Sequence, residues 1–272
     1  MLNKAAVVAA FNKHFMRYCG SKKRYAKYII PYLIGAIKDE NTTFIDMCCG
    51  GCSIVSEMPH KKKIAVDNNE YLISLWNKLK QNVLNGFPCD GIPFDITEEQ
   101  YYSIKDCWLN KDGRWPDYMI GYVANALSYG SSWFNGFAKP NYNKTNKYGQ
   151  PENHCHEAYN SLKKQLLNFK FIENTDFICS SFENFEIPSD SVLYIDPPYI
   201  NTKKYKDDFP HEQFYEWCRE ISKKNVKIFM SEYDAPDDFE CIWQMEKKDG
   251  LGTQKGKKQN TKVEKLFVYN RK

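Results

Sequence analysis

The sequence predicts an α/β protein: a doubly wound, mostly parallel sheet with a smaller, mainly helical lobe inserted into the chain. Three observations support this fold class. A strand, a glycine loop, a second strand and an amphipathic helix follow one another over residues 42–79. The chain then changes character over 85–169, and a buried-strand pattern resumes at 176. This order is typical of sheets that bind ligands at the carboxyl ends of their strands.

The composition bounds the class of protein. The 272 residues are 42% hydrophobic, enough for one large domain with a smaller lobe. We find no apolar run long enough to cross a bilayer and no secretory signal, so we expect a cytoplasmic protein without a membrane partner. The ten cysteines are then expected to be reduced. A net charge of +4 does not by itself indicate a nucleic-acid binder.

The first half of the predicted sheet lies in residues 42–84. We expect a buried strand at 42–47, a tight loop at 48–53, the start of a helix at 54–57, and a second strand at 63–67. The next helix carries Leu72, Leu75 and Leu79 at helical spacing, and Asn68 or Asn69 is expected to cap it.

Residues 85–169 are predicted to form the inserted lobe, between catalytic segments 1–84 and 170–272. A helix start at 97–100 and helices at 117–129 and 154–168 are expected, with a long loop at 130–150. Such a loop in a compact protein is usually functional or disordered. After the lobe, the pattern predicts strands at 176–179, 192–196 and 226–231, a helix at 212–224, and an antiparallel pair at 240–245 and 263–269.

The most informative segment is Asp196, Pro197, Pro198 and Tyr199, directly after the apolar run 192–195. The prolines hold the chain extended and bias the residue before each of them away from the helical region. A stiff edge with a carboxylate, unpaired carbonyl groups and an aromatic ring can hold a planar base by its amino group and its face. The alternative is an ordinary Asp-Pro turn.

A nucleoside-containing cofactor is predicted from the first half of the sheet. Asp67 lies about twenty residues after the first strand, where such folds place a carboxylate on a ribose. The loop 46–53 lacks a GxGxxG pattern and has only Gly50 and Gly51. This favours S-adenosyl-L-methionine, whose ribose suits Asp67 and whose sulfonium needs no metal. The alternative for the glycine pair is an ordinary strand-to-helix turn.

Six segments, in this order, resemble those of the Dam family of adenine-specific DNA methyltransferases. They are 17–22, 44–53, 66–68, 196–199, 231–234 and 261–266. The tetrapeptide 196–199 is the specific match, and it is unchanged. The first segment departs from the family at Tyr18 and Ser21, and the glycine loop carries three cysteines. The resemblance implies a Rossmann-like S-adenosylmethionine-dependent fold and transfer of a methyl group to N6 of a flipped-out adenine in double-stranded DNA.

The resemblance also implies roles for single residues. The catalytic segment would be Asp196, Pro197, Pro198 and Tyr199. The cofactor site would comprise Tyr18, Lys22, Asp46, Cys48, Gly50, Ser53, Asp67, Asn68, Phe182 and Asp196. The lobe matches the family's target-recognition segments only faintly, so we expect phosphate contact and base recognition from the lysine clusters and the loop 130–150, at Trp133, Asn135, Phe137, Lys139, Tyr142, Lys144, Lys203 and Lys204. We expect a site-specific enzyme, a monomer or weak dimer, with a cognate restriction endonuclease as a further partner.

Other readings stay open. Cys48, Cys49 and Cys52 with 154–156 could be read as a zinc site, but the spacing fits zinc patterns poorly, so no metal is expected. The acceptor could instead be an RNA adenine, cytosine N4 or a glutamine amide. A protein that only binds DNA could retain the fold without catalysis.

Overall fold

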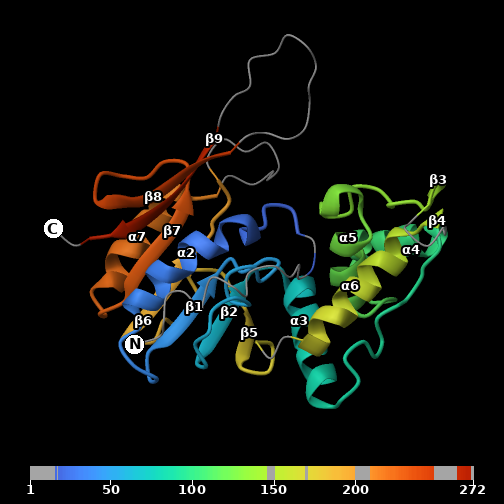
Figure 1. The fold of residues 1–272 in the computed structure, drawn as a ribbon, viewed down its shortest axis with the longest axis horizontal. Helices are drawn as coiled ribbons and strands as arrows, with labels where there is room; N and C mark the ends of the chain where they lie inside the picture. The colour runs from blue at the N-terminus through green and yellow to red at the C-terminus, as the bar shows by residue number, and fades with distance from the viewer. Residues whose placement is uncertain are drawn as a thin grey trace, which may run out of the picture.

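A seven-stranded sheet forms the core of the larger part of the protein, described here from a computed structural model (Figure 1). The structure describes residues 16, 18–145, 151–168, 171–199, 209–247 and 262–270. The strand order is β5-β2-β1-β6-β7-β9-β8. The strands are β1 (Thr43–Met47), β2 (Lys63–Asp67), β5 (Thr175–Cys179), β6 (Ser191–Ile195), β7 (Lys227–Glu232), β8 (Phe239–Lys247) and β9 (Lys262–Tyr269).

The sheet is mixed and mostly parallel, which confirms the predicted fold class. Strands β5, β2, β1, β6 and β7 run parallel, and β9 is antiparallel to both β7 and β8. Every residue of β1 and β6 is buried. In β1, Phe44 packs on one face of the sheet while Ile45 and Met47 pack on the other. Strands covered on both faces are expected to be continuously apolar.

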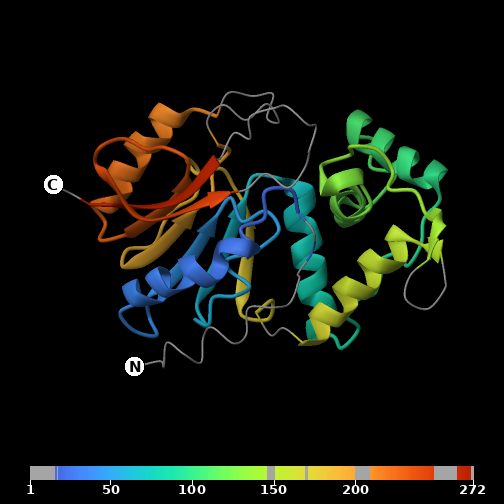
Figure 2. The same cartoon turned by 45° about the horizontal axis from the view of Figure 1, so that its top comes forward.

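Helices cover both faces of this sheet. The helices α2 (Lys23–Ala36) and α3 (Glu70–Leu84) belong to the hydrophobic cluster on one face, and α7 (His211–Ser222) belongs to the cluster on the other (Figures 1 and 2). Asn69 is the cap of α3, because its side chain accepts the Leu72 N–H at 3.1 Å. The prediction of an asparagine cap is therefore confirmed at Asn69.

A second group of elements lies on the far side of α3 (Figure 2). It contains α4 (Glu98–Asn110), α5 (Asp117–Ala126), the 3-10 turn η1 (Tyr129–Ser131), α6 (His154–Asn168) and the hairpin β3 (Asn141–Thr145) and β4 (Pro151–Glu152). A capping box of Thr97 and Gln100 starts α4. Gly121 lets α5 approach α3 closely, because a Cβ there would lie 2.2 Å from the Tyr71 carbonyl oxygen.

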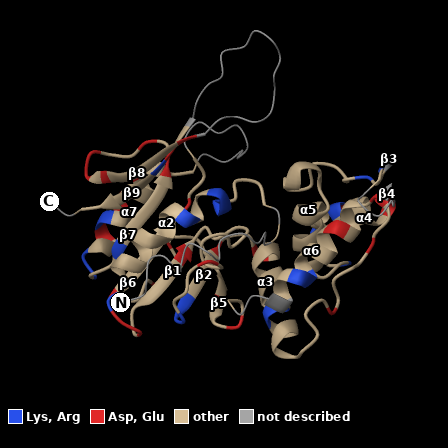
Figure 3. Ribbon diagram, in the orientation of Figure 1, with Lys and Arg blue, Asp and Glu red and all other residues tan. Residues whose placement is uncertain are grey.

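The order of the strands reverses between β1 and β6. From β1 the chain builds outward to β2 and β5, and it then returns to β6 and builds the other way. In open α/β sheets the crevice at the carboxyl ends of two such strands is where ligands bind. Acidic segments (red in Figure 3) lie in β1 and at the end of β2, at Asp46 and Asp67.

Three predicted elements differ from the structure. The helix start expected at 54–57 is wrong: the segment forms turns, because Pro59 disfavours a helical conformation at Met58. The helix expected at 117–129 ends at Ala126, since Ser128 is extended and bridges to Phe137. The loop expected at 130–150 contains strand β3, which pairs with β4. In the part of the chain that is described, no helix could span a membrane.

Candidate active site

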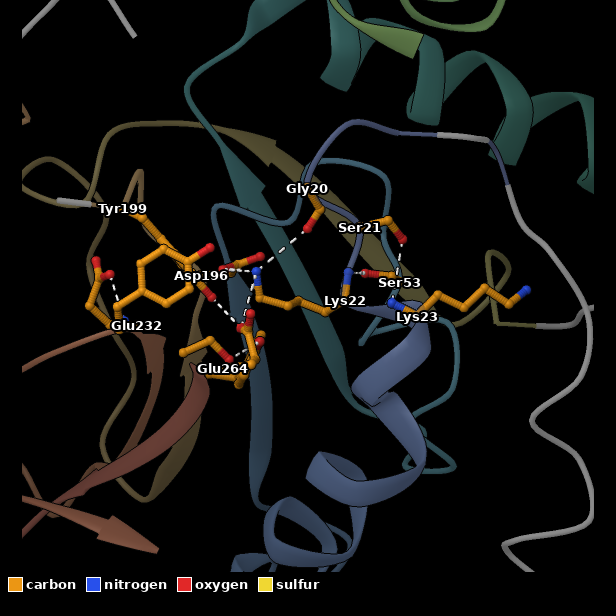
Figure 4. Close-up of polar contacts among 12 residues, drawn as sticks. Gly20, Ser21, Lys22, Lys23, Ser53, Asp196, Tyr199, Glu232 and Glu264 are labelled. Atoms are coloured by element: carbon orange, nitrogen blue, oxygen red, sulfur yellow. Dashed lines mark hydrogen bonds and ion pairs between the residues drawn. The ribbon is translucent and has the colours of Figure 1, made fainter. Parts of the chain in front are cut away.

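Lys22 brings three distant parts of the chain together. It is the residue before α2, only 6% of its surface is exposed, and its backbone N–H donates to Ser53 Oγ at 3.0 Å. Its Nζ lies 2.8 Å from Asp196 Oδ1, at the end of β6, and 3.5 Å from Glu264 Oε1, on β9 (Figure 4). The side chain thus joins the segment before α2 to the carboxyl edge of the sheet.

Asp196 lies at the switch point of the sheet. Its backbone N–H donates to the Met47 carbonyl at 3.3 Å, which ties the tetrapeptide to the end of β1. Burial raises the pKa of the Asp196 carboxyl to about 6, although the neighbouring Lys22 ammonium opposes that rise. Near neutral pH the group is therefore mostly ionised, and it can accept hydrogen bonds.

The Tyr199 ring is held on three sides. Lys22 Nζ lies 4.4 Å from the ring centroid, and the Tyr233 ring meets it edge-on with 4.5 Å between centroids. The Tyr199 hydroxyl donates to Glu264 Oε1. Burial raises the pKa of Tyr199 well above its ordinary value, so the phenol remains a donor. Figure 4 shows Lys22, Asp196, Tyr199 and Glu264 pointing toward one another.

The glycine loop is tied to the end of β2 through Asp67. Gly50 N–H donates to Asp67 Oδ2 at 2.9 Å, and Asn69 N–H donates to Oδ1 at 3.0 Å. The Gly50 carbonyl accepts the Trp76 Nε1–H at 3.0 Å. Burial raises the pKa of Asp67, while these backbone donors oppose that rise. The loop is therefore held between β2 and α3.

Tyr18 packs directly on the two glycines of this loop. A Cβ at Gly51 would lie 2.5 Å from Tyr18 Cβ, and one at Gly50 would lie 2.7 Å from the ring. Gly50 and Cys48 both have positive φ, at 46° and 61°. Glycine adopts that region without strain, whereas a cysteine there is uncommon. The structure thus brings Tyr18, Lys22 and the loop into one contiguous site.

The site is acidic. Asp46 is buried, its Oδ2 accepts the Val55 N–H at 2.9 Å, and burial raises its pKa to about 8, with Asp196 and Asp67 adding to the rise. Asp196 and Glu264 lie beside the Lys22 ammonium, whereas Asp67 is held by backbone donors and Asp46, with its raised pKa, is mostly protonated near neutral pH.

Of the remaining predicted cofactor residues, Asn68 joins this network through its backbone N–H, which lowers the pKa of Asp67, whereas Phe182 lies apart from it. Asn68 is exposed beyond the end of β2. Phe182 is 6% exposed, and its ring meets those of Phe214 and Trp217 edge-on, within the cluster on the α7 face. Their contact with the cofactor stays a prediction.

Some of the predicted nucleic-acid residues are half-buried and pack against the core, and others are exposed. Trp133 packs against Tyr71 and Trp108, and Phe137 packs against Tyr101. Exposed positions are Asn135, whose Nδ2 donates to the Tyr129 carbonyl, Lys139, which pairs with Glu98 at 2.8 Å, and Lys144 on β3. Tyr142 is placed on β3 by its backbone, and Lys203 and Lys204 lie outside the described residues.

The sequence analysis missed Glu264 and Trp76. Trp76 fits an ordinary core position of α3, and only its Nε1 contact with Gly50 distinguishes it. Glu264 carried a signal, since it interrupts the alternating apolar pattern of β9 on the face of Leu266 and Val268. Over the described ranges, no cluster of three His, Cys, Asp or Glu side chains is arranged to hold a metal ion.

A mostly parallel sheet with acidic residues and a glycine loop at its switch point is typical of α/β proteins that bind a ligand at the carboxyl ends of their strands. A sequence model of D12 class N6 adenine-specific DNA methyltransferases matches residues 18–248. The chain belongs to this family. The match confirms the family of adenine-specific DNA methyltransferases that the motifs predicted.

A curated relative and two solved structures also match. The type II methyltransferase M.FokI of Planomicrobium okeanokoites is 24% identical over 225 residues, which cover 77% of this chain and 32% of that protein. The chain thus spans about a third of the length of this relative. A candidate RNA methyltransferase from Pyrococcus horikoshii aligns over 100% of this chain and 99% of its own, with a TM-score of 0.44 and 11% identity. A candidate methylase from Haemophilus influenzae aligns over 91% and 98%, with a TM-score of 0.35 and 12% identity.

Proposed function

We propose that the protein is a site-specific methyltransferase that moves a methyl group from S-adenosyl-L-methionine to N6 of an adenine in double-stranded DNA. Family membership supports the reaction class. The main structural support is the position of Asp196. It lies at the switch point of the sheet, in an acidic site beside the glycine loop and Tyr199.

Asp196 and Pro197 are proposed to bind the amino group of the target base. The lone pair of adenine N6 is delocalised into the ring, which makes it a poor nucleophile. Hydrogen bonds from N6–H to the Asp196 carboxylate and the Pro197 carbonyl would draw electron density back to the nitrogen. The same carboxylate would accept the proton that the nitrogen sheds after methylation, since its pKa of about 6 leaves it ionised at neutral pH.

Tyr199 is proposed to stack on the extruded base. Extrusion costs a few kcal/mol, which stacking and pocket hydrogen bonds offset. The Tyr199 ring is already held by Lys22, Tyr233 and Glu264. A ring held in place before the base arrives loses little freedom on binding, so more of the stacking energy remains for positioning.

The cofactor would lie between Asp67 and Asp196. When bound, it supplies a methyl group on a positively charged sulfonium. Asp67 would accept a ribose hydroxyl with lone pairs that its backbone donors Gly50, Asn68 and Asn69 leave available, and the glycine loop under Tyr18 would face the amino-acid tail.

Residues 85–169 are proposed to form the target-recognition lobe. The Cys19 N–H donates to the Ser131 carbonyl at 3.2 Å, so the cofactor segment touches the turn η1 at the start of loop 130–150. Exposed Lys139 and Lys144 would contact phosphates, as would Lys203 and Lys204. Exchange of loop 130–150 for that of another member of the family is expected to change the methylated sequence while cofactor binding is retained.

The deciding experiment incubates the purified protein with radiolabelled S-adenosyl-L-methionine and unmethylated DNA. Label in N6-methyladenine is expected, and Asp196→Ala should abolish it while the fold persists. An active, folded Asp196→Ala variant would refute the assignment. Parallel reactions with RNA, and base analysis for N4-methylcytosine, test the other acceptors.

The biological role is proposed from the relative, whose name marks it as a type II methyltransferase. We propose that this enzyme, as a monomer or weak dimer, protects its sites from a cognate restriction endonuclease. DNA from cells that express it should then carry one methylated sequence, read by single-molecule sequencing, and should resist cleavage by the endonuclease of that specificity.

A further inference from the structure

Glu264 is a buried carboxylate in an apolar stripe. On β9 it shares a face with Leu266 and Val268, which pack in the cluster covered by α2, and only 2% of its surface is exposed. Burial of a carboxylate is costly unless it is paired and hydrogen-bonded, whereas an apolar side chain would pack there without that cost. An acid at this position therefore needs compensating contacts, and these contacts indicate its role.

Among the residues that the structure describes, one oxygen of the Glu264 side chain makes two polar contacts. Oε1 accepts the Tyr199 hydroxyl and also lies 3.5 Å from Lys22 Nζ. Lys22 Nζ in turn lies 2.8 Å from Asp196 and 4.4 Å from the centre of the Tyr199 ring. Glu264 thus contacts the stacking ring and the partner of the catalytic carboxylate at once (Figure 4).

We propose that Glu264 is a positioning residue for methyl transfer, which fixes the Tyr199 ring through its hydroxyl and shares the Lys22 ammonium with Asp196. This inference rests on the function proposed above. The ammonium has three N–H donors, and its oxygen neighbours are Asp196, Glu264 and the Gly20 carbonyl at 3.5 Å. Without the charge of Glu264, Lys22 would pair with Asp196 alone and compete with the amino group of the base.

Glu264→Gln isolates the charge, because the amide oxygen can still accept the Tyr199 hydroxyl. The Glu264 charge raises the pKa of Asp196, so its loss should shift the acidic limb of the rate profile to lower pH. The rate at pH 7 should fall roughly tenfold, as for loss of one charge-assisted contact. Glu246→Gln, at an exposed glutamate of the adjacent strand β8, is the matched control and should change neither quantity.

Glu264→Leu and Tyr199→Phe test the hydrogen bond between Glu264 and Tyr199, here called the tether, by removing one partner at a time. Glu264→Leu should lower the rate more than Glu264→Gln while the melting temperature stays equal or rises, since a leucine suits the apolar stripe. A purely structural role would lower stability and rate together. The two changes should be partly non-additive in the double variant, because both remove the Tyr199–Glu264 hydrogen bond, while Tyr199→Phe also removes the contact of the hydroxyl with Asp196 and Glu264→Leu the contact with Lys22. With 2-aminopurine at the target position, both should reduce the fluorescence of the extruded base equally.

The results separate the inference from the proposed function. If the unaltered protein methylates no DNA, the proposed function fails. If the unaltered protein methylates DNA, and Glu264→Gln has the same acidic limb of the rate profile and the same rate at pH 7, only the role of Glu264 is overturned. Additive effects of Glu264→Leu and Tyr199→Phe would also overturn it. If the Glu264 variants do not fold, Tyr199→Phe decides: a wild-type rate and fluorescence would refute the tether.

Discussion

The Lys22 ammonium lies 2.8 Å from the Asp196 carboxylate, although the two residues are 174 positions apart in the chain. Both groups are largely withdrawn from solvent, with side-chain exposures of 7% and 20%. A buried pair of this kind is costly to break from one side, because the remaining charge has no compensation. The pair therefore connects the charge state of Asp196 to the position of the segment that precedes α2.

Methyl transfer should depend on pH through Asp196. Burial raises the pKa of this carboxyl to about 6, and only its ionised form can accept both an N6–H bond and the released proton. We expect kcat/KM to rise about tenfold per pH unit below pH 6 and to level off above it. Initial rates between pH 5 and 8 test this, with cofactor affinity measured at each pH as the control. A flat profile from pH 5 to 7 would contradict the assignment.

Lys22→Met should shift the acidic limb of the rate profile to higher pH, which is opposite to the shift expected for Glu264→Gln. Without the ammonium, only the hydrogen bond from the Tyr199 hydroxyl still opposes the effect of burial and of Glu264, so the pKa of Asp196 rises above about 6. We expect a loss of about 3 kcal/mol of stability and a rate at pH 7 that is at least roughly tenfold lower. Denaturant unfolding and rate profiles measure both. The control is Lys27→Met at an exposed lysine of α2, and equal effects of the two variants would disprove the prediction.

Asp46 should make folding less favourable as the pH rises. Burial raises its pKa from an ordinary value near 3.8 to about 8, so the folded state holds a proton that the unfolded chain releases. The free energy of unfolding should therefore decline between about pH 4 and 8. Asp46→Asn keeps an acceptor for the Val55 N–H without the titration, and it should melt roughly 5 °C higher than wild type at pH 8.

Thermal melts at several pH values check this expectation. Asp237→Asn, at an exposed aspartate, is the control and should follow the wild-type curve. Parallel slopes for Asp46→Asn and the wild type would show that Asp46 does not titrate in this way.

Gly121→Ala should separate α5 from α3. The added Cβ would lie 2.2 Å from the Tyr71 carbonyl oxygen, which is backbone and is unable to turn aside. We expect a loss of about 3 kcal/mol in unfolding free energy. Gly35→Ala in α2 meets nothing within 4 Å and should instead stabilise the protein by up to about 1 kcal/mol. A neutral Gly121→Ala variant would rule out the close packing of these helices.

Much of the fold was predictable because it depends on local patterns. Strand β2 and helix α6 have the predicted bounds, and the box of Thr97 and Gln100 begins α4 as expected. The helix start predicted at 54–57 was wrong because a short apolar run before a proline resembles the first turn of a helix. The predicted end of the helix at 129 was wrong because α5 is followed by a bridge between Ser128 and Phe137, which is a tertiary contact.

The sequence by itself determined the family, the mostly parallel sheet and the segment that ends in Asp196, since strand periodicity, prolines and motif order are properties of neighbouring residues. Tertiary structure alone decided that Lys22, Asp196, Tyr199 and Glu264 form one network. The distances within that network depend on a strand order that places β6 beside β1 and β7 beside β9. Which charges share a buried site, and hence how each titrates, depends on distances in space that spacing along the chain does not encode.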